Sequence, residues 1–124
     1  MKNTFRDVFL VAAKRTPVGA FQGSLSSVSA TTLGSEVVKA ILEETKISLD
    51  SVDEVIMGCV LSAGLGQAPA RQVALRSGLS NSVECLTINK MCGSGLKAVM
   101  LASQAIKTED ADLIIAGGME NMTR

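Results

Sequence analysis

Blocks of apolar and polar residues alternate along the chain and predict strands and helices in turn. Compact apolar runs, typical of buried strands, occupy residues 8–13, 54–61, 83–88 and 112–116. Between them, apolar residues recur at spacings of three and four, the period of an amphipathic helix, in segments that begin at Thr31, Pro69 and Cys92. Residues 18–29 and 62–67 lack either period and predict loops.

The predicted helices carry signals for their ends and their inward faces. Thr31 and Thr32 can cap the first helix. Pro69 suits the first turn of the second helix, which we expect to run to Arg76 and to end at Gly78. The spacing predicts two inward faces: Leu33, Val37 and Ile41 in the first helix, and Leu96, Val99, Met100, Ser103 and Ile106 in the third.

The order of these elements predicts an α/β fold, with helices layered on a mostly parallel core sheet and joined to it by right-handed crossovers. A chain of 124 residues is long enough for one domain with one core. It ends just after the last predicted strand, without a capping helix or a polar tail. We therefore expect residues 1–124 to be an incomplete part of a larger domain.

Composition argues against several classes of function. The 12 basic and 12 acidic residues balance, and three Phe are the only aromatic residues, which argues against a nucleic-acid partner. No apolar run approaches the roughly 20 residues of a membrane span, and the first residues lack a secretion signal. Cys59, Cys85 and Cys92 form no C-x-x-C pair, and the absence of histidine argues against a metal site. An odd number of cysteines suits a reducing compartment, so we expect a cytoplasmic protein.

Cys92 is the candidate for chemistry, because it lies where the third predicted strand turns into the third helix. If the helix begins there, its unpaired N–H groups and the positive end of its dipole favour a thiolate nucleophile. The small residues 93–95 (GSG) would leave room for a bulky acyl group. The alternative is a packing role, since free cysteine is often buried as a small apolar residue.

A second alternative is a dinucleotide-binding turn. Gly93, Gly95 and Ala98 match the glycine fingerprint of such turns, and Glu120 could accept a hydrogen bond from a ribose. That fingerprint normally opens its domain, whereas several predicted elements precede it here. The pattern alone leaves both functions open.

Residues 88–99 (INKMCGSGLKAV) resemble the acyl-enzyme cysteine signature of the thiolase family. Three further segments resemble that family in the same order and spacing: 14–21 (KRTPVGAF), 64–72 (GLGQAPARQ) and 117–122 (GGMENM). Together they span nearly the whole chain. The Cys-Gly-Ser-Gly form is more similar to the biosynthetic acetoacetyl-CoA thiolases than to the degradative 3-ketoacyl-CoA enzymes, which tend to carry Ser in place of Gly93.

The resemblance implies a thiolase-like N-terminal domain and a covalent mechanism. Cys92 would take the acetyl group from acetyl-CoA, and a second acetyl-CoA would condense with it, reversibly, to give acetoacetyl-CoA and CoA. The backbone N–H of the nucleophile would help to stabilise the oxyanion. The resemblance implies no cofactor besides the coenzyme A thioester that serves as substrate, and a full-length protein that forms a homo-oligomer, either a dimer or a tetramer.

The resemblance also shows what this chain lacks. The family uses a histidine, a second cysteine and an asparagine-held water from its C-terminal half, and none can be assigned here. We expect Cys59 and Cys85 to be buried structural thiols. We also expect Arg71 and Arg76 to lie on a solvated or interface face of their helix rather than to contact the phosphates of CoA. The 124 residues alone should be inactive, and a non-catalytic thiolase remnant is a third possibility.

Overall fold

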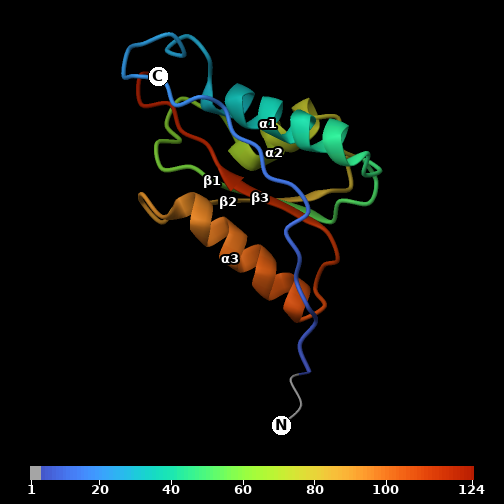
Figure 1. Ribbon diagram of the computed structural model, residues 1–124. Helices are drawn as coiled ribbons and strands as arrows, with labels where there is room; N and C mark the ends of the chain where they lie inside the picture. The colour runs from blue at the N-terminus through green and yellow to red at the C-terminus, as the bar shows by residue number, and fades with distance from the viewer. Residues whose placement is uncertain (1–3) are drawn as a thin grey trace.

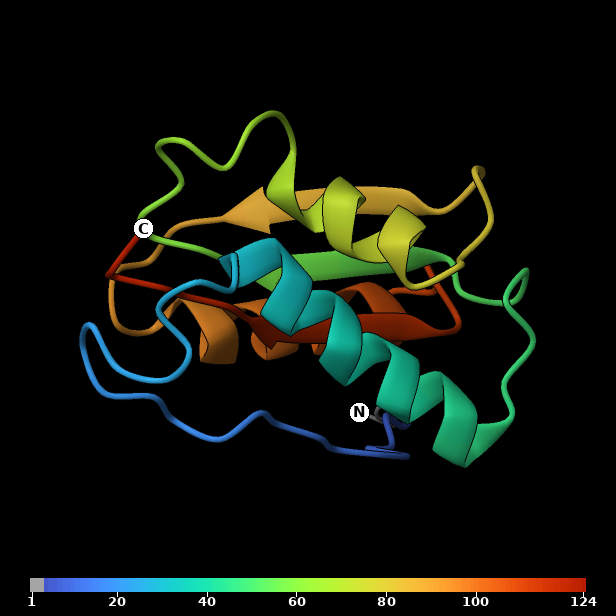
Figure 2. The same cartoon turned by 90° about the horizontal axis from the view of Figure 1, so that it is seen from above.

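A parallel three-stranded sheet forms the centre of the computed structural model, which describes residues 4–124 (Figure 1). The elements are α1 (Ala30–Thr45), β1 (Glu54–Gly58), α2 (Pro69–Arg76), β2 (Glu84–Ile88), α3 (Ser94–Lys107) and β3 (Ile114–Gly118). The strand order is β2-β1-β3, so β1 is central. Helices α1 and α2 cover one face of the sheet and α3 covers the other (Figures 1 and 2). The predicted α/β class with a parallel sheet is confirmed.

The central strand β1 is apolar because neither of its faces meets solvent. Val55, Ile56 and Met57 are each at most 4% exposed. Val55 and Met57 belong to the larger core cluster with α1 and α2, whereas Ile56 packs with Ala98 and Ala102 of α3. Side chains that alternate across a strand therefore fill both cores, as expected for a parallel sheet covered on both sides.

Helix α1 packs on the sheet through a face different from the predicted one. Its buried residues are Ala30, Thr31, Gly34, Ser35, Val38 and Leu42, while the predicted inward residues Leu33, Val37 and Ile41 are only half-buried. The N-cap is Ser29, not Thr31 or Thr32, and its side chain accepts a hydrogen bond from the backbone of Thr32. Small residues form the inward row because the helix lies close to its neighbours. A Cβ on Gly34 would lie 3.0 Å from Met119 Sδ.

Helix α3 shows the same preference for small residues at its contact with the sheet. Its buried residues are Ser94, Ala98 and Ala102, one turn apart. Leu96 and Met100, which were predicted to face inward, are 69% and 49% exposed, so that prediction was wrong. The predicted inward residues Val99, Ser103 and Ile106 are half-buried. The large apolar residues at helical spacing therefore lie on a face next to the buried one, which is formed by Ser94, Ala98 and Ala102.

The prediction of a strand at residues 8–13 was also wrong. This segment has no strand pairing, and Phe9 and Leu10 are 78% and 87% exposed. It runs along the β3 side of the molecule (Figure 2), where a groove of about 510 Å³ separates it from β3, α3 and α1. An apolar run becomes a strand only where its backbone groups find a partner strand. No described residue provides one here.

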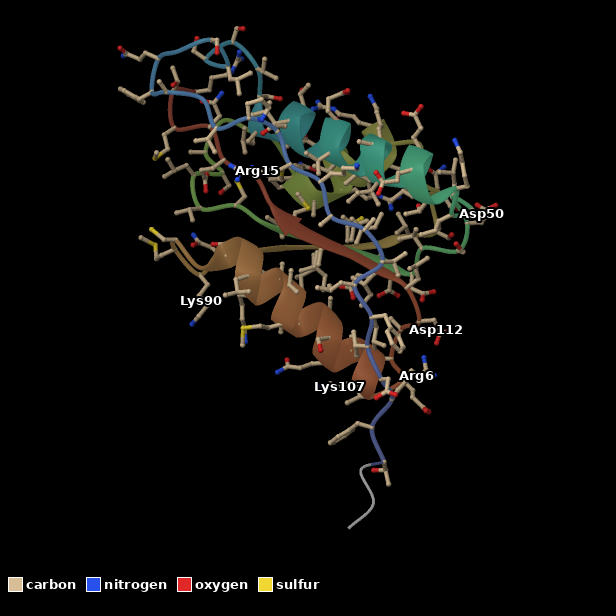
Figure 3. The ribbon with its side chains drawn as sticks, in the orientation of Figure 1. Arg6, Arg15, Asp50, Lys90, Lys107 and Asp112 are labelled. Atoms are coloured by element: carbon tan, nitrogen blue, oxygen red, sulfur yellow. The ribbon has the colours of Figure 1, made fainter. Side chains whose placement is uncertain are left out.

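Ion pairs flank this segment on both sides. Arg6 pairs with Asp112, just before β3, and Lys14 pairs with Glu44 of α1. Arg6 and Asp112 lie together near Lys107, at the C-terminal end of α3 (Figure 3).

None of the helices in residues 4–124 has the length and apolar character that a membrane-spanning segment needs.

Candidate active site

The turn that carries Cys92 joins β2 to α3 and has an unusual backbone. Met91 has a φ of +47°, in the left-handed region that side-chain-bearing residues seldom adopt. Its N–H donates to the side-chain oxygen of Asn89 over 3.0 Å. The turn therefore rests on a local side-chain hydrogen bond, of the kind through which asparagine commonly stabilises turns.

Ser94, the first residue of α3, closes the same turn from the other side. Its hydroxyl accepts a hydrogen bond from the Lys90 N–H over 2.9 Å and donates one to the Met91 carbonyl over 2.6 Å. Only 6% of Ser94 is exposed. The sequence predicted only that Ser94 is a small residue that leaves space, so this role was not foreseen. The signal was a serine in the first turn of a helix, where hydroxyls often bond to nearby backbone groups.

Cys92 lies two residues before the first residue of α3, because the N-cap is Gly93 and the helix begins at Ser94. The prediction that the helix begins at Cys92 was therefore wrong. Cys92 is an exposed free cysteine. Within residues 4–124, neither its thiol nor its backbone N–H has a hydrogen-bond partner. The exposure of Cys92 argues against the alternative of a packing role.

Gly95 of the candidate dinucleotide fingerprint faces the sheet. A Cβ on Gly118 would lie 3.0 Å from the Gly95 Cα, so the two backbones are in close contact. Glu120, the candidate ribose acceptor, instead accepts hydrogen bonds from the Val60 and Leu61 N–H groups, each over 2.9 Å. Gly95 therefore serves the contact between α3 and β3, and the Glu120 carboxylate binds the loop after β1. Both contacts argue against the dinucleotide alternative.

Of the other two cysteines, Cys59 is buried as predicted, whereas Cys85 is only half-buried. Cys59 is 2% exposed, and burial together with the nearby charge of Glu120 raises the pKa of its thiol to about 11. Cys85 is half-buried, and burial raises its pKa although the guanidinium of Arg71 acts in the opposite direction. A thiol with a raised pKa is a poor nucleophile at neutral pH. Both are therefore weaker candidates for a nucleophile than the exposed Cys92.

The two arginines of α2 form hydrogen bonds within the protein. Arg71 donates to the carbonyl oxygens of Val83 and Asn81, over 2.7 and 2.8 Å, and so ties α2 to the chain before β2. Arg76 donates to the Thr31 hydroxyl in α1 over 2.7 Å.

Among the described residues, no group of three or more His, Cys, Asp or Glu side chains is arranged so that it could hold a metal ion.

Comparison with known proteins agrees with this arrangement. The family model of the thiolase N-terminal domain matches residues 8–124. Over 119 residues the chain is 58% identical to a probable acetyl-CoA acetyltransferase of Escherichia coli K12, a match that covers 96% of this chain and 30% of that protein. Over 117 residues it is 56% identical to the acetyl-CoA acetyltransferase of Cupriavidus necator H16, covering 94% of this chain and 30% of that one.

The chain therefore belongs to the thiolase family. The part of the family that it matches is the N-terminal domain, and it spans about 30% of the length of these relatives. The resemblance drawn from the residues around Cys92 is confirmed at the level of the family.

Proposed function

We propose that residues 1–124 form part of the N-terminal domain of an acetyl-CoA acetyltransferase, and that Cys92 is its acyl-accepting nucleophile. The observation that carries the proposal is the exposed thiol of Cys92 at a turn held from both sides. Among residues 4–124, the backbone N–H beside this thiol has no hydrogen-bond partner. The names of the relatives supply the substrate class, since several are acetyl-CoA acetyltransferases. The substrates would be acetyl-CoA and, in reverse, acetoacetyl-CoA with CoA.

In the first step, the Cys92 thiolate attacks the carbonyl carbon of acetyl-CoA. A carbon–sulfur bond forms, the tetrahedral intermediate collapses, and CoA leaves as its thiolate. In the second step, another acetyl-CoA loses a proton from its methyl carbon, and this proton converts the released CoA thiolate to its thiol. The resulting carbanion attacks the carbonyl carbon of the acetyl-cysteine, a carbon–carbon bond forms, and the carbon–sulfur bond to Cys92 breaks. The products are acetoacetyl-CoA and the regenerated Cys92 thiolate, so two acetyl-CoA yield one acetoacetyl-CoA and one CoA.

The backbone of the turn would assist both steps. The unpaired N–H of Cys92 can donate to the oxyanion that develops on the acetyl carbonyl next to the sulfur. Proton transfer needs further groups, and this chain has no histidine. We propose that the activating histidine and a second cysteine come from parts of the full-length protein that correspond to the unmatched length of its relatives. We also propose that this protein is a cytoplasmic homo-oligomer without a further cofactor.

The test is to incubate the full-length protein with acetyl-CoA labelled in the acetyl group and to map the label by mass spectrometry. We expect the label on Cys92, and none after a Cys92→Ala substitution. Cys85→Ser is the matched control, because its half-buried thiol should leave labelling unchanged. Condensation at the wild-type rate by Cys92→Ala would refute the proposal. A protein that takes no label at all would support the non-catalytic remnant, and a rise in Tm with NAD(H) would support the dinucleotide alternative.

A further inference from the structure

We infer that Asn89 is a positioning residue for Cys92, which it holds in place through the backbone of Met91. This inference rests on the proposed function of Cys92. It concerns a residue that does not touch the reacting atoms. Three observations carry it: the backbone conformation of Met91, the contacts of the Asn89 side chain, and the network to which these contacts lead.

The first observation is that Met91, the residue before the nucleophile, stays in a conformation that its side chain disfavours. Its φ is +47°, and its side chain is exposed, so packing around the side chain does not enforce this backbone. Hydrogen bonds must therefore do so. Two backbone groups of Met91 form such bonds. Its carbonyl accepts from the Ser94 hydroxyl, and its N–H donates to the side-chain oxygen of Asn89.

The second observation is that the Asn89 carboxamide uses both of its ends. Its oxygen accepts from the Met91 N–H over 3.0 Å, and its nitrogen donates to the Val60 carbonyl over 3.5 Å. Val60 lies in the loop that follows β1, the strand next to β2. Asn89 thus links the turn of Cys92 to a neighbouring loop at the same edge of the sheet.

The third observation is that this neighbouring loop is itself fixed. The Glu120 carboxylate, after β3, accepts from the N–H groups of Val60 and Leu61. The chain of contacts therefore runs from the loop after β3, through the loop after β1, to the turn after β2. If Asn89 were removed, Met91 would lose the bond to its N–H and the link to this frame, while Ser94 would still hold the carbonyl.

A small displacement of Cys92 should slow its acylation, since misplacement of a reacting group by about 1 Å can reduce a rate by about a hundredfold. In the full-length protein, we expect Asn89→Ala to slow the burst of CoA release from acetyl-CoA by about 10- to 100-fold, with KM changed by less than about twofold. Asn89→Ser should recover much of the rate, because a serine hydroxyl can also accept a hydrogen bond from the N–H two residues on. Asn81→Ala, at an exposed loop position, is the matched control.

Hydrogen exchange tests the same contact without substrate. We expect the Met91 amide to exchange at least about tenfold faster in Asn89→Ala, and at the wild-type rate in Asn81→Ala. A purely structural role would lower Tm but leave acylation per folded molecule unchanged, and that result overturns the inference, as does an unchanged exchange rate. If wild-type Cys92 takes no acetyl group, the proposed function fails together with the catalytic part of this inference. Normal acylation of Asn89→Ala beside an acylated wild type overturns the inference alone.

Discussion

Gly58, the last residue of β1, packs directly against the backbone of Ser94, the first residue of α3. A Cβ on Gly58 would lie 2.5 Å from the carbonyl carbon of Ser94 and 2.8 Å from the nitrogen of the next residue. Atoms that are not bonded to each other do not approach so closely, and backbone cannot move aside as the end of a side chain can. The missing side chain at position 58 therefore fixes where α3 begins, and with it the turn that carries Cys92.

Gly58→Ala should displace the start of α3. We expect the full-length protein to lose about 1–3 kcal/mol in its free energy of unfolding, the usual cost of overpacking, together with most of its acetylation at Cys92. Gly117→Ala is the matched control, because a Cβ there would meet only the end of Met57, at 3.8 Å. Urea unfolding and acetyl labelling measure the two effects. Equal behaviour of the two variants would contradict the steric argument.

The three cysteines should react with iodoacetamide in a fixed order. Cys92 is exposed and should be modified first, Cys85 more slowly, and Cys59 last. With a pKa of about 11, Cys59 would be thiolate in about one molecule in a thousand at pH 8, and it is also buried. Peptide mapping at increasing times gives the order. Early modification of Cys59 in the folded protein would show that this region of the structure is wrong.

Asp53 should make stability depend on pH at the acidic end. Its carboxylate accepts hydrogen bonds from the backbone N–H groups of Leu113 and Asp112, which lower its pKa below the usual 3.8. The stabilisation is therefore present above pH 3.8 and is lost as the pH falls through the lower pKa of the folded state. For this exposed group, we expect Asp53→Asn to cost only about 0.5–1 kcal/mol at pH 7. Urea unfolding should show the difference from wild type shrinking below pH 3.8.

Glu54 should have the opposite effect. Burial, together with the charges of Glu84 and Asp110, raises its pKa above the usual 4.5. The folded state then favours the protonated form, so the penalty is present at neutral pH and disappears as the pH falls through the raised pKa toward 4.5. We expect Glu54→Gln to stabilise the protein at pH 7 by about 0.3–1 kcal/mol, and Glu43→Gln, on the exposed face of α1, to change little. Equal unfolding midpoints for Glu54→Gln and wild type would contradict this.

The α/β class could be predicted from the sequence because apolar runs that mark strands alternate with segments of helical period, and both patterns are local. In the central strand β1, residues 55–58 carry no polar side chain and are buried. The strand predicted at 8–13 failed because pairing depends on a partner that the local sequence does not contain. The inward faces of α1 and α3 were misjudged because close packing selects Gly34 and Ala98 over the larger residues beside them.

In the candidate site, too, the local features could be predicted from the sequence, and the contacts between distant segments could not. Cys92 could be singled out and the family recognised, because a cysteine next to glycines after a strand is a local pattern. The contacts of Asn89 and Glu120 with the loop at Val60 could not be predicted, since they join segments 29 and 60 residues apart in the chain. The left-handed backbone conformation of Met91 could not be predicted either, because methionine is not a residue type that favours that conformation.

Residues 1–124 expressed alone should fold poorly and show no thiolase activity. Many large apolar side chains remain exposed, among them Phe9 and Leu10 beside the groove along β3 and Leu96 and Met100 on α3. Such surface is normally covered in a stable protein, and uncovered it favours aggregation. We expect the isolated chain to bind the dye ANS strongly, to unfold without a sharp transition and to give no acetoacetyl-CoA, whereas the full-length protein should bind little dye. A cooperative transition without dye binding, or measurable turnover, would show that these 124 residues are sufficient by themselves.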